Sequence, residues 1–195
     1  ATPMQLAVAT MAIANNGLVY QPQLIRAWSD PVSGQLSQAA PRLVGHIAMK
    51  PEHVRLVREA MVEVMLPGGT AAVAGAGTPY PLAGKTGTAQ VVGIRQGEKY
   101  NEHQVAARHR DHALFIAFAP ADDPKIVLAV MVENGGHGGS TAAPVARKVI
   151  DYWLLGKQPS APVTPEAAER ATEEEEDTAT RDETVPTATE EVVPQ

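Results

Sequence analysis

The chain has 195 residues, a formal net charge of −6 and a hydrophobic fraction of 44%, and it contains no cysteine. The absence of cysteine is compatible with an oxidising compartment but does not identify one. No run of about 18 apolar residues occurs, which excludes a transmembrane helix within this sequence. The first residues show neither an initiator methionine nor the basic start of a signal peptide, so we expect a mature chain or a fragment.

Charge divides the chain into two parts. Residues 158–195 carry 11 acidic and 2 basic side chains, and five of the acidic ones are consecutive. With almost no large apolar side chain, this segment cannot bury enough surface to offset the entropy lost on ordering. We therefore predict a disordered acidic tail at 158–195, with an acidic interaction segment as the alternative. Residues 1–157 are numerous enough to build a sizeable core.

The predicted domain begins with a helix. Thr2 can cap this helix, Pro3 suits its first position, and Gln5 completes a capping box. The apolar run from Met4 to Ala14 is nearly continuous, so we expect the helix to be buried on several sides. The sequence Asn15-Asn16-Gly17 then provides a stop signal.

Two short strands, a loop and a second helix complete the first half. The strands are predicted at 18–20 and 23–28, and the composition of residues 29–41 indicates a loop. The second helix is expected to begin at Pro51 and to end at Pro67-Gly68-Gly69. Its apolar residues recur at spacings of three and four, which predicts one buried face. That face comprises Val54, Val57, Met61 and Val64.

Three strands are predicted for the second half, at 85–94, 112–119 and 125–133, and a short connection joins the last two. Apolar and polar residues do not alternate cleanly in the last two strands. Both faces of their sheet are therefore expected to be covered.

A final helix is predicted after the glycine-rich segment 135–139. We expect Ser140 to cap it and Leu155 to lie near its end. Its buried residues are expected to be Val145, Val149 and either Tyr152 or Trp153. The order of elements predicts an α+β domain, in which helices flank an antiparallel sheet.

The sharpest local signal is Gly84-Lys85-Thr86-Gly87-Thr88, at the start of the first of these three strands. Lys85 supplies a positive charge, and Thr86 and Thr88 supply hydroxyls that can bind a carboxylate. Gly87 lets the backbone of a ligand approach the strand, whose exposed edge can pair with an extended peptide. This combination favours recognition of an anion beside a reacting carbonyl.

Two other interpretations of this segment remain open. Gly84-Lys85-Thr86 is similar to the end of a phosphate-binding P-loop, but that motif requires a glycine where Pro79 stands. It also requires a helix after the threonine, where we predict a strand. The second interpretation is an ordinary strand with a surface lysine, because three residues alone carry little specificity.

The context of the segment comes from three further blocks. They are the N-terminal Ala-Thr-Pro-Met-Gln-Leu helix with Asn16-Gly17, the strand that follows Arg110-Asp111, and Glu133-Asn134-Gly135-Gly136 before a helix. Together with Lys85-Thr86-Gly87, they resemble the class B penicillin-binding proteins of the elongation type over about residues 1–156. The resemblance implies the C-terminal part of a β-lactamase/transpeptidase-like domain.

What the resemblance implies for the whole protein is a serine-type D-Ala-D-Ala transpeptidase. Such an enzyme cross-links peptidoglycan stem peptides during cell elongation and is acylated by β-lactam antibiotics. The implied location is the inner membrane, with the catalytic domain in the periplasm, and the implied partners are membrane proteins of the elongation complex. No cofactor and no nucleic acid are implied.

The resemblance also assigns roles to the residues of the Lys-Thr-Gly segment. Lys85 would orient the serine of the family's Ser-x-Asn motif and raise the local positive potential. Thr86 and Thr88, on either side of Gly87, would hold the terminal carboxylate of the substrate or the β-lactam. The backbone N–H of Thr88 would be one of two oxyanion-hole donors.

The sequence departs from the family pattern in its serines. None of the five has lysine three positions later or asparagine two positions later; they are Ser29, Ser33, Ser37, Ser140 and Ser160. We therefore expect the nucleophile, its lysine and the Ser-x-Asn motif to precede Ala1, and the fragment alone to be inactive. A β-lactam-sensing binding domain and a serine β-lactamase-type hydrolase of the same fold remain as alternatives.

Histidines are the remaining candidates for a site. His103, His109 and His112 could be considered as metal ligands, but their spacing matches no known geometry, so we predict no metal site. His137 lies among glycines, and we expect it in an exposed loop.

Overall fold

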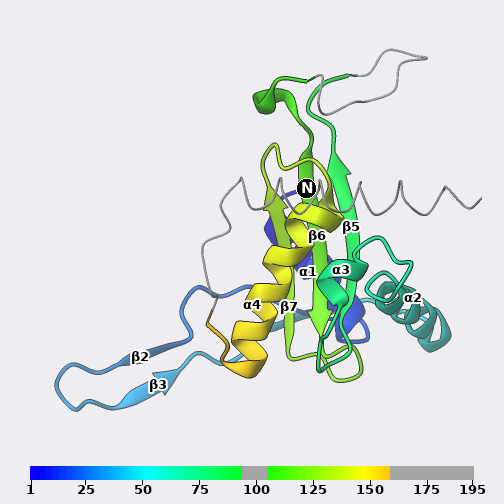
Figure 1. Cartoon of the computed structure of the whole chain (residues 1–195). Coiled ribbons are helices and arrows are strands. Elements are labelled where there is room, and N and C mark those ends of the chain that lie inside the picture. Colours follow the sequence, from blue (N-terminus) through cyan, green and yellow to red (C-terminus); the bar gives the residue numbers. More distant parts are fainter. Residues whose placement is uncertain (94–104, 159–195) are drawn as a thin grey trace, which may run out of the picture. The chain divides into compact units, whose positions relative to one another are not determined.

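The computed structural model describes residues 1–93 and 105–158 (Figure 1). Apart from Gln158, the predicted acidic tail lies outside these residues, as does Ile94 of the predicted strand 85–94. Within the described part of the chain, no helix is long and apolar enough to cross a membrane. In chain order the helices and strands are α1 (Pro3–Ala14), β1 (Leu18–Tyr20), β2 (Ala27–Ser29), β3 (Leu36–Gln38), β4 (Leu43–His46), α2 (Pro51–Glu63), α3 (Ala72–Gly75), β5 (Ala83–Ala89), β6 (His112–Ala119), β7 (Ile126–Val132) and α4 (Ala143–Leu155).

The centre of the fold is an antiparallel sheet with the strand order β5-β6-β7. Lys85 pairs with Ile116 across the first two strands, and Ala117 pairs with Leu128 across the last two. Among the described strands, only β6 pairs with β5, so the other edge of β5 has no strand beside it. This arrangement confirms the predicted antiparallel meander and places the Lys-Thr-Gly segment at a sheet edge.

Both faces of the sheet are covered, as predicted. Successive residues of a strand point to opposite faces. Phe115 and Ala117 therefore pack with α3 and α4, in a cluster that includes Ile150. Phe118 points the other way and packs with Met61 of α2 and the end of α1. Figure 1 shows α4 in front of the strands and α1 behind them.

The first helix follows its predicted start and stop. The Thr2 hydroxyl accepts a hydrogen bond from the Gln5 amide at 3.2 Å, and the Gln5 side chain accepts one from the Thr2 amide at 2.8 Å. The helix ends at Ala14, and Asn16 adopts a left-handed conformation with φ of 54°. Burial on several sides holds only for its second half, because the side chains near Met4 are exposed.

The small strands of the first half differ from the prediction. β1 lies where expected, but it pairs with β4, which the sequence did not indicate. The expected strand at 23–28 is displaced to β2, and β3 lies inside the expected loop 29–41. β2 and β3 form a hairpin whose turn is closed by hydrogen bonds from the amides of Val32 and Ser33 to the Asp30 carboxylate. Three-residue strands beside such turn-forming residues carry too little periodicity to be recognised.

Two predicted helix faces also require correction. In α2, which ends at Glu63 rather than at the glycines, Val54 and Met61 are buried but Val57 is exposed. Ser140 does not cap α4: a wide helical turn, η3 (Gly138–Ala142), precedes that helix.

The face of α4 that meets the sheet is formed by two alanines and an isoleucine. Ala143, Ala146 and Ile150 are buried there, whereas Val149, Tyr152 and Trp153 are exposed. The sequence offers two neighbouring apolar stripes on this helix. The one with alanines lets the helix approach β6 closely.

Candidate functional site

The four residues predicted to form the site lie together on β5. Thr86 is paired with Phe115, so its side chain is on the face that carries α3 and α4. Lys85 is paired with Ile116 and belongs to the opposite face. Lys85 and Thr88 are exposed, and Thr86 and Gly87 are half-buried. A ligand along the free edge of β5 would therefore meet side chains from both faces of the sheet.

The side chain of Lys85 turns back toward its own strand. Its Nζ atom donates a hydrogen bond to the carbonyl oxygen of Thr86 at 2.7 Å. This contact holds the ammonium charge beside the backbone of the Lys-Thr-Gly segment rather than extended into solvent. A carboxylate at this edge would gain electrostatic stabilisation from that charge.

The hydroxyl of Thr86 has a partner that the sequence did not indicate. The Oγ1 atoms of Thr86 and Thr70 lie 3.2 Å apart, and either can be the donor. Thr70 follows the glycines after α2 and lies 16 positions before Thr86. No periodic pattern in the sequence relates the two residues. The only feature that could have drawn attention to Thr70 is that its hydroxyl directly follows the glycines after the second helix.

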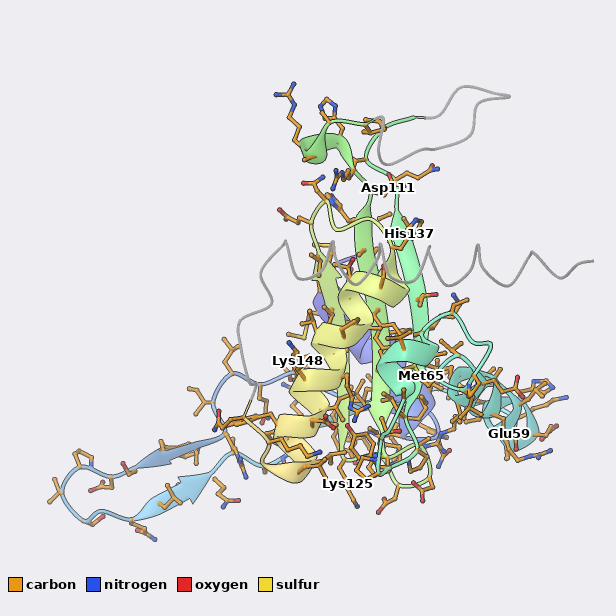
Figure 2. The ribbon with its side chains drawn as sticks, viewed as in Figure 1. Glu59, Met65, Asp111, Lys125, His137 and Lys148 are labelled. Carbon is orange, nitrogen blue, oxygen red and sulfur yellow. The ribbon has the colours of Figure 1, made fainter. Side chains whose placement is uncertain are left out.

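The glycine-rich segment after β7 packs directly on β5. A Cβ atom added at Gly138 would lie 2.2 Å from the carbonyl oxygen of Leu114 and 2.7 Å from that of Gly87. Only glycine permits this approach, because real Cβ atoms do not come so close to backbone oxygens. His137 precedes this contact and is exposed, as predicted; Figure 2 shows it beside the upper part of the sheet.

A cluster of polar side chains supports the segment that leads into β5. Arg147 of α4 donates to Asp151 at 2.9 Å and to the carbonyl oxygens of Ala74 and Ala76 at 3.0 and 3.1 Å. The Tyr80 hydroxyl donates to the same Asp151 carboxylate at 2.5 Å. Burial, reinforced by the Asp151 carboxylate, raises the pKa of the Tyr80 hydroxyl. The cluster therefore ties α4 to the backbone just before the Lys-Thr-Gly strand.

The far end of β5 is fixed by a second set of hydrogen bonds. The buried carboxylate of Asp111 accepts a hydrogen bond from the amide of Val91 at 3.1 Å. The Nδ1 atom of His112 accepts one from the amide of Asn134 at 2.9 Å.

Across residues 1–93 and 105–158, no group of three or more His, Cys, Asp or Glu side chains could hold a metal ion. Of the three candidate ligands, His103 lies outside these ranges, and His112 has this structural role.

A pocket of about 900 Å³ lies away from the Lys-Thr-Gly segment. Its walls come from the turn after α1, from α2 and from the β6–β7 connection, and include Asn16, Val54, Arg58 and Ala121. Arg58 donates to the carbonyl oxygen of Ala14 at 2.6 Å and covers the ring of Phe118. None of the residues from Lys85 to Thr88 lines this pocket, so pocket size does not identify the candidate site.

The sequence and the fold are both similar to those of known proteins. The chain is 44% identical to the peptidoglycan D,D-transpeptidase MrdA of Acinetobacter baumannii over 166 residues, which are 85% of this chain and 24% of that protein. Its structure is similar to that of Pseudomonas aeruginosa PBP2 in complex with WCK 5153, with a TM-score of 0.59, 37% identity, and 85% of this chain and 32% of that chain covered. It is also similar to PBP2 in the complex with MreC from Helicobacter pylori, with a TM-score of 0.55, 27% identity, and coverage of 80% and 26%.

The match covers only part of each relative. It spans about a quarter of the length of the MrdA relatives that it matches. The family described as the penicillin binding protein transpeptidase domain matches residues 1–151, which is most of the described part of the chain. The chain therefore belongs to the penicillin-binding protein transpeptidase family.

Proposed function

We propose that this chain supplies the Lys-Thr-Gly wall of the active site of a peptidoglycan D,D-transpeptidase. One observation carries the proposal: Lys85-Thr86-Gly87-Thr88 lies on the free edge of β5 in a chain that matches the transpeptidase family over residues 1–151. The 44% identity to a peptidoglycan D,D-transpeptidase supports the same reaction for the whole protein.

The reaction divides the work between this chain and the serine motifs of the whole protein. A serine hydroxyl attacks the carbonyl carbon of the penultimate D-alanine of a stem peptide, and terminal D-alanine leaves as the amine. The resulting acyl-enzyme passes its acyl group to the amino group of a second stem peptide, which restores the serine. A β-lactam enters by the same attack, because its ring amide takes the place of the D-Ala-D-Ala bond.

Lys85, Thr86 and Thr88 recognise the anionic end of the donor in this proposal. The Lys85 ammonium, held beside the backbone at Thr86, attracts the terminal carboxylate and orients the serine of the Ser-x-Asn motif. The hydroxyls of Thr86 and Thr88 share one face of the strand edge and donate to the carboxylate oxygens.

The backbone N–H of Thr88 is the proposed oxyanion donor. Gly87 is paired with Leu114. The Gly87 nitrogen, the Gly87 oxygen and the Leu114 oxygen all lie within 3.0 Å of the position that a Cβ atom added at Gly138 would occupy. This proximity supports a pair in which Gly87 and Leu114 exchange their backbone hydrogen bonds. Because such pairs alternate along antiparallel strands, the N–H groups of Thr86 and Thr88 then point to the free edge.

The proposal extends to the partners and location of the whole protein. Its substrates are peptidoglycan stem peptides, and β-lactam antibiotics acylate it. The H. pylori relative was solved in complex with MreC, which supports partners from the elongation complex. We place the catalytic domain in the periplasm and the anchor of the whole protein in the inner membrane.

The experiment follows release of D-alanine by the purified whole protein from a pentapeptide that ends in D-Ala-D-Ala, with and without an acceptor amine. A transpeptidase forms the cross-linked amide, and the yield of that amide rises with the amine concentration. A β-lactam sensor is acylated by penicillin but releases no D-alanine. A hydrolase releases product without using the amine, and either of the last two results would overturn the proposal.

A further inference from the structure

We propose that Thr70 is a positioning residue that sets the direction of the Thr86 hydroxyl and thereby tunes selectivity for donors with a free carboxylate. This inference rests on the proposed function, because it concerns the same anion-binding edge of β5. It adds a residue from a different part of the chain, the turn between α2 and α3. The observation behind it is the 3.2 Å separation of the two Oγ1 atoms.

The backbone on both sides of Thr70 is held in place. A Cβ atom added at Gly69 would lie 2.3 Å from the carbonyl oxygens of Glu63 and Val64, so this turn packs tightly against the end of α2. On the other side, the amide of Ala71 donates to the carbonyl oxygen of Val64 at 3.0 Å, and the Ala71 side chain is buried. Although Thr70 is exposed, its hydroxyl is therefore presented from a fixed backbone.

The segment after β7 packs on Thr70 close to Thr86. A Cβ atom added at Gly139 would lie 2.1 Å from the carbonyl oxygen of Thr70 and 3.5 Å from the methyl group of Thr86. Gly139 thus packs against the backbone of Thr70, and the Thr86 methyl group lies on the same side of Gly139. The Thr86 hydroxyl has Thr70 as its partner, and the β-branched side chain has few rotamers available.

The hydrogen bond between the two threonines can run in either direction, and only one direction serves an anion. A hydroxyl has one proton to donate and two lone pairs to accept with. If Thr86 donates to Thr70, its proton is not available to a carboxylate, which can only accept. If Thr70 donates to Thr86, the Thr86 proton is free to point at the ligand. A bound carboxylate therefore selects the order Thr70 to Thr86 to carboxylate, and such chains strengthen each bond.

This arrangement predicts that removal of the Thr70 hydroxyl slows acylation by donors that carry a carboxylate more than acylation by donors that lack one. Without the Thr70 hydroxyl, Thr86 keeps its proton but loses the donor that polarises it and fixes its direction. Donors that carry a carboxylate should then lose about fivefold in acylation rate, the effect expected for one net hydrogen bond. Donors without that charge gain little from the chain of hydroxyls, so their rate should change much less.

The test uses the whole protein and two probes, a penicillin with its free carboxylate and the methyl ester of the same penicillin. The ratio of their second-order acylation rates is measured for the parent, Thr70→Val, Thr70→Ser and the control Thr78→Val. Thr78 lies just after α3, and its hydroxyl donates to the carbonyl oxygen of Gly75 at 3.1 Å rather than to a residue of β5. We expect Thr70→Val to lower the carboxylate-to-ester ratio about fivefold. Thr70→Ser should restore that ratio, and Thr78→Val should leave it unchanged.

A double-mutant cycle with Thr86→Val distinguishes positioning of the Thr86 hydroxyl by Thr70 from a general disturbance of the site. If Thr70 acts through Thr86, adding Thr70→Val to Thr86→Val should not lower the ratio further. An equal loss for both probes, or an additive loss in the double variant, would overturn the inference. If the parent protein is not acylated by the carboxylate probe at all, the proposed function fails instead, so the two failures are distinguishable.

Discussion

Arg147 and Asp151 lie one turn apart on α4 and form an ion pair with an Nε–Oδ2 distance of 2.9 Å. Their side chains are only 16% and 18% exposed. The same guanidinium holds the carbonyl oxygens of Ala74 and Ala76, and the same carboxylate accepts from the Tyr80 hydroxyl. The pair thus joins the last helix to the backbone that enters the Lys-Thr-Gly strand.

We expect Arg147→Met to lower the unfolding free energy of the whole protein by about 3 kcal/mol, because the Asp151 charge would remain largely buried without its cation. The measurement is a denaturant titration. A matched control is Arg55→Met, which removes an ion pair of similar length, 3.0 Å, between side chains that are 72% and 54% exposed. The control should change the free energy by less than about 1 kcal/mol. Equal losses in both variants would contradict the structural role of the cluster.

The contact between Gly138 and β5 gives a second prediction. Gly138→Ala should destabilise the protein by about 1–3 kcal/mol and slow acylation, since the added methyl group must displace η3 or the backbone of Gly87. Gly45→Ala is the control, because no atom lies within 4 Å of a Cβ added there. The checks are the melting temperature and the rate of penicillin acylation. A Gly138→Ala protein that matches Gly45→Ala in both would show that the close contact is absent.

The 195-residue chain on its own should not react covalently with penicillin. It contains no Ser-x-x-Lys sequence, so it lacks the activated serine that attacks a β-lactam. The measurement is incubation with a fluorescent penicillin, followed by denaturing electrophoresis. A labelled band at the mass of this chain would reveal a nucleophile that its sequence pattern does not indicate.

Much of the central fold could be predicted from the sequence. The capping box at Thr2, the strand 112–119 and the coverage of both sheet faces follow from local residue patterns, and the structure confirms them. Lys85 was predicted to begin a strand. It does lie on a strand, β5, which begins two residues earlier, at Ala83.

The rest depends on contacts between distant residues. β4 exists because β1 pairs with it, and the buried face of α4 is decided by the close approach of Ala146 to the sheet. Thr70 could not be predicted as a neighbour of Thr86, because the turn after α2 brings them together only in the folded chain. A single sequence contains no periodic signal for such a contact.

Thr88→Val tests the proposed carboxylate contact in the whole protein. Valine keeps the shape of the side chain and removes only the hydroxyl, while the backbone N–H remains available as the oxyanion donor. We expect acylation by a carboxylate-bearing β-lactam to slow about tenfold with little change in melting temperature. Stopped-flow measurement of the acylation rate provides the check. An unchanged rate would remove the Thr88 hydroxyl from the site.

The most direct test of the account is the second-order acylation rate of Lys85→Ala in the whole protein, measured beside its melting temperature. Lys125→Ala is the control, because Lys125 is also exposed and pairs with Asp123 at 2.6 Å, at the opposite end of the sheet from His137 (Figure 2). We expect Lys85→Ala to lower the rate by about 10²–10³, because its charge acts as the transition state forms, and to leave the melting temperature nearly unchanged. The control should retain the parent rate. A Lys85→Ala protein that acylates at the parent rate would contradict the assignment of Lys-Thr-Gly as an active-site wall.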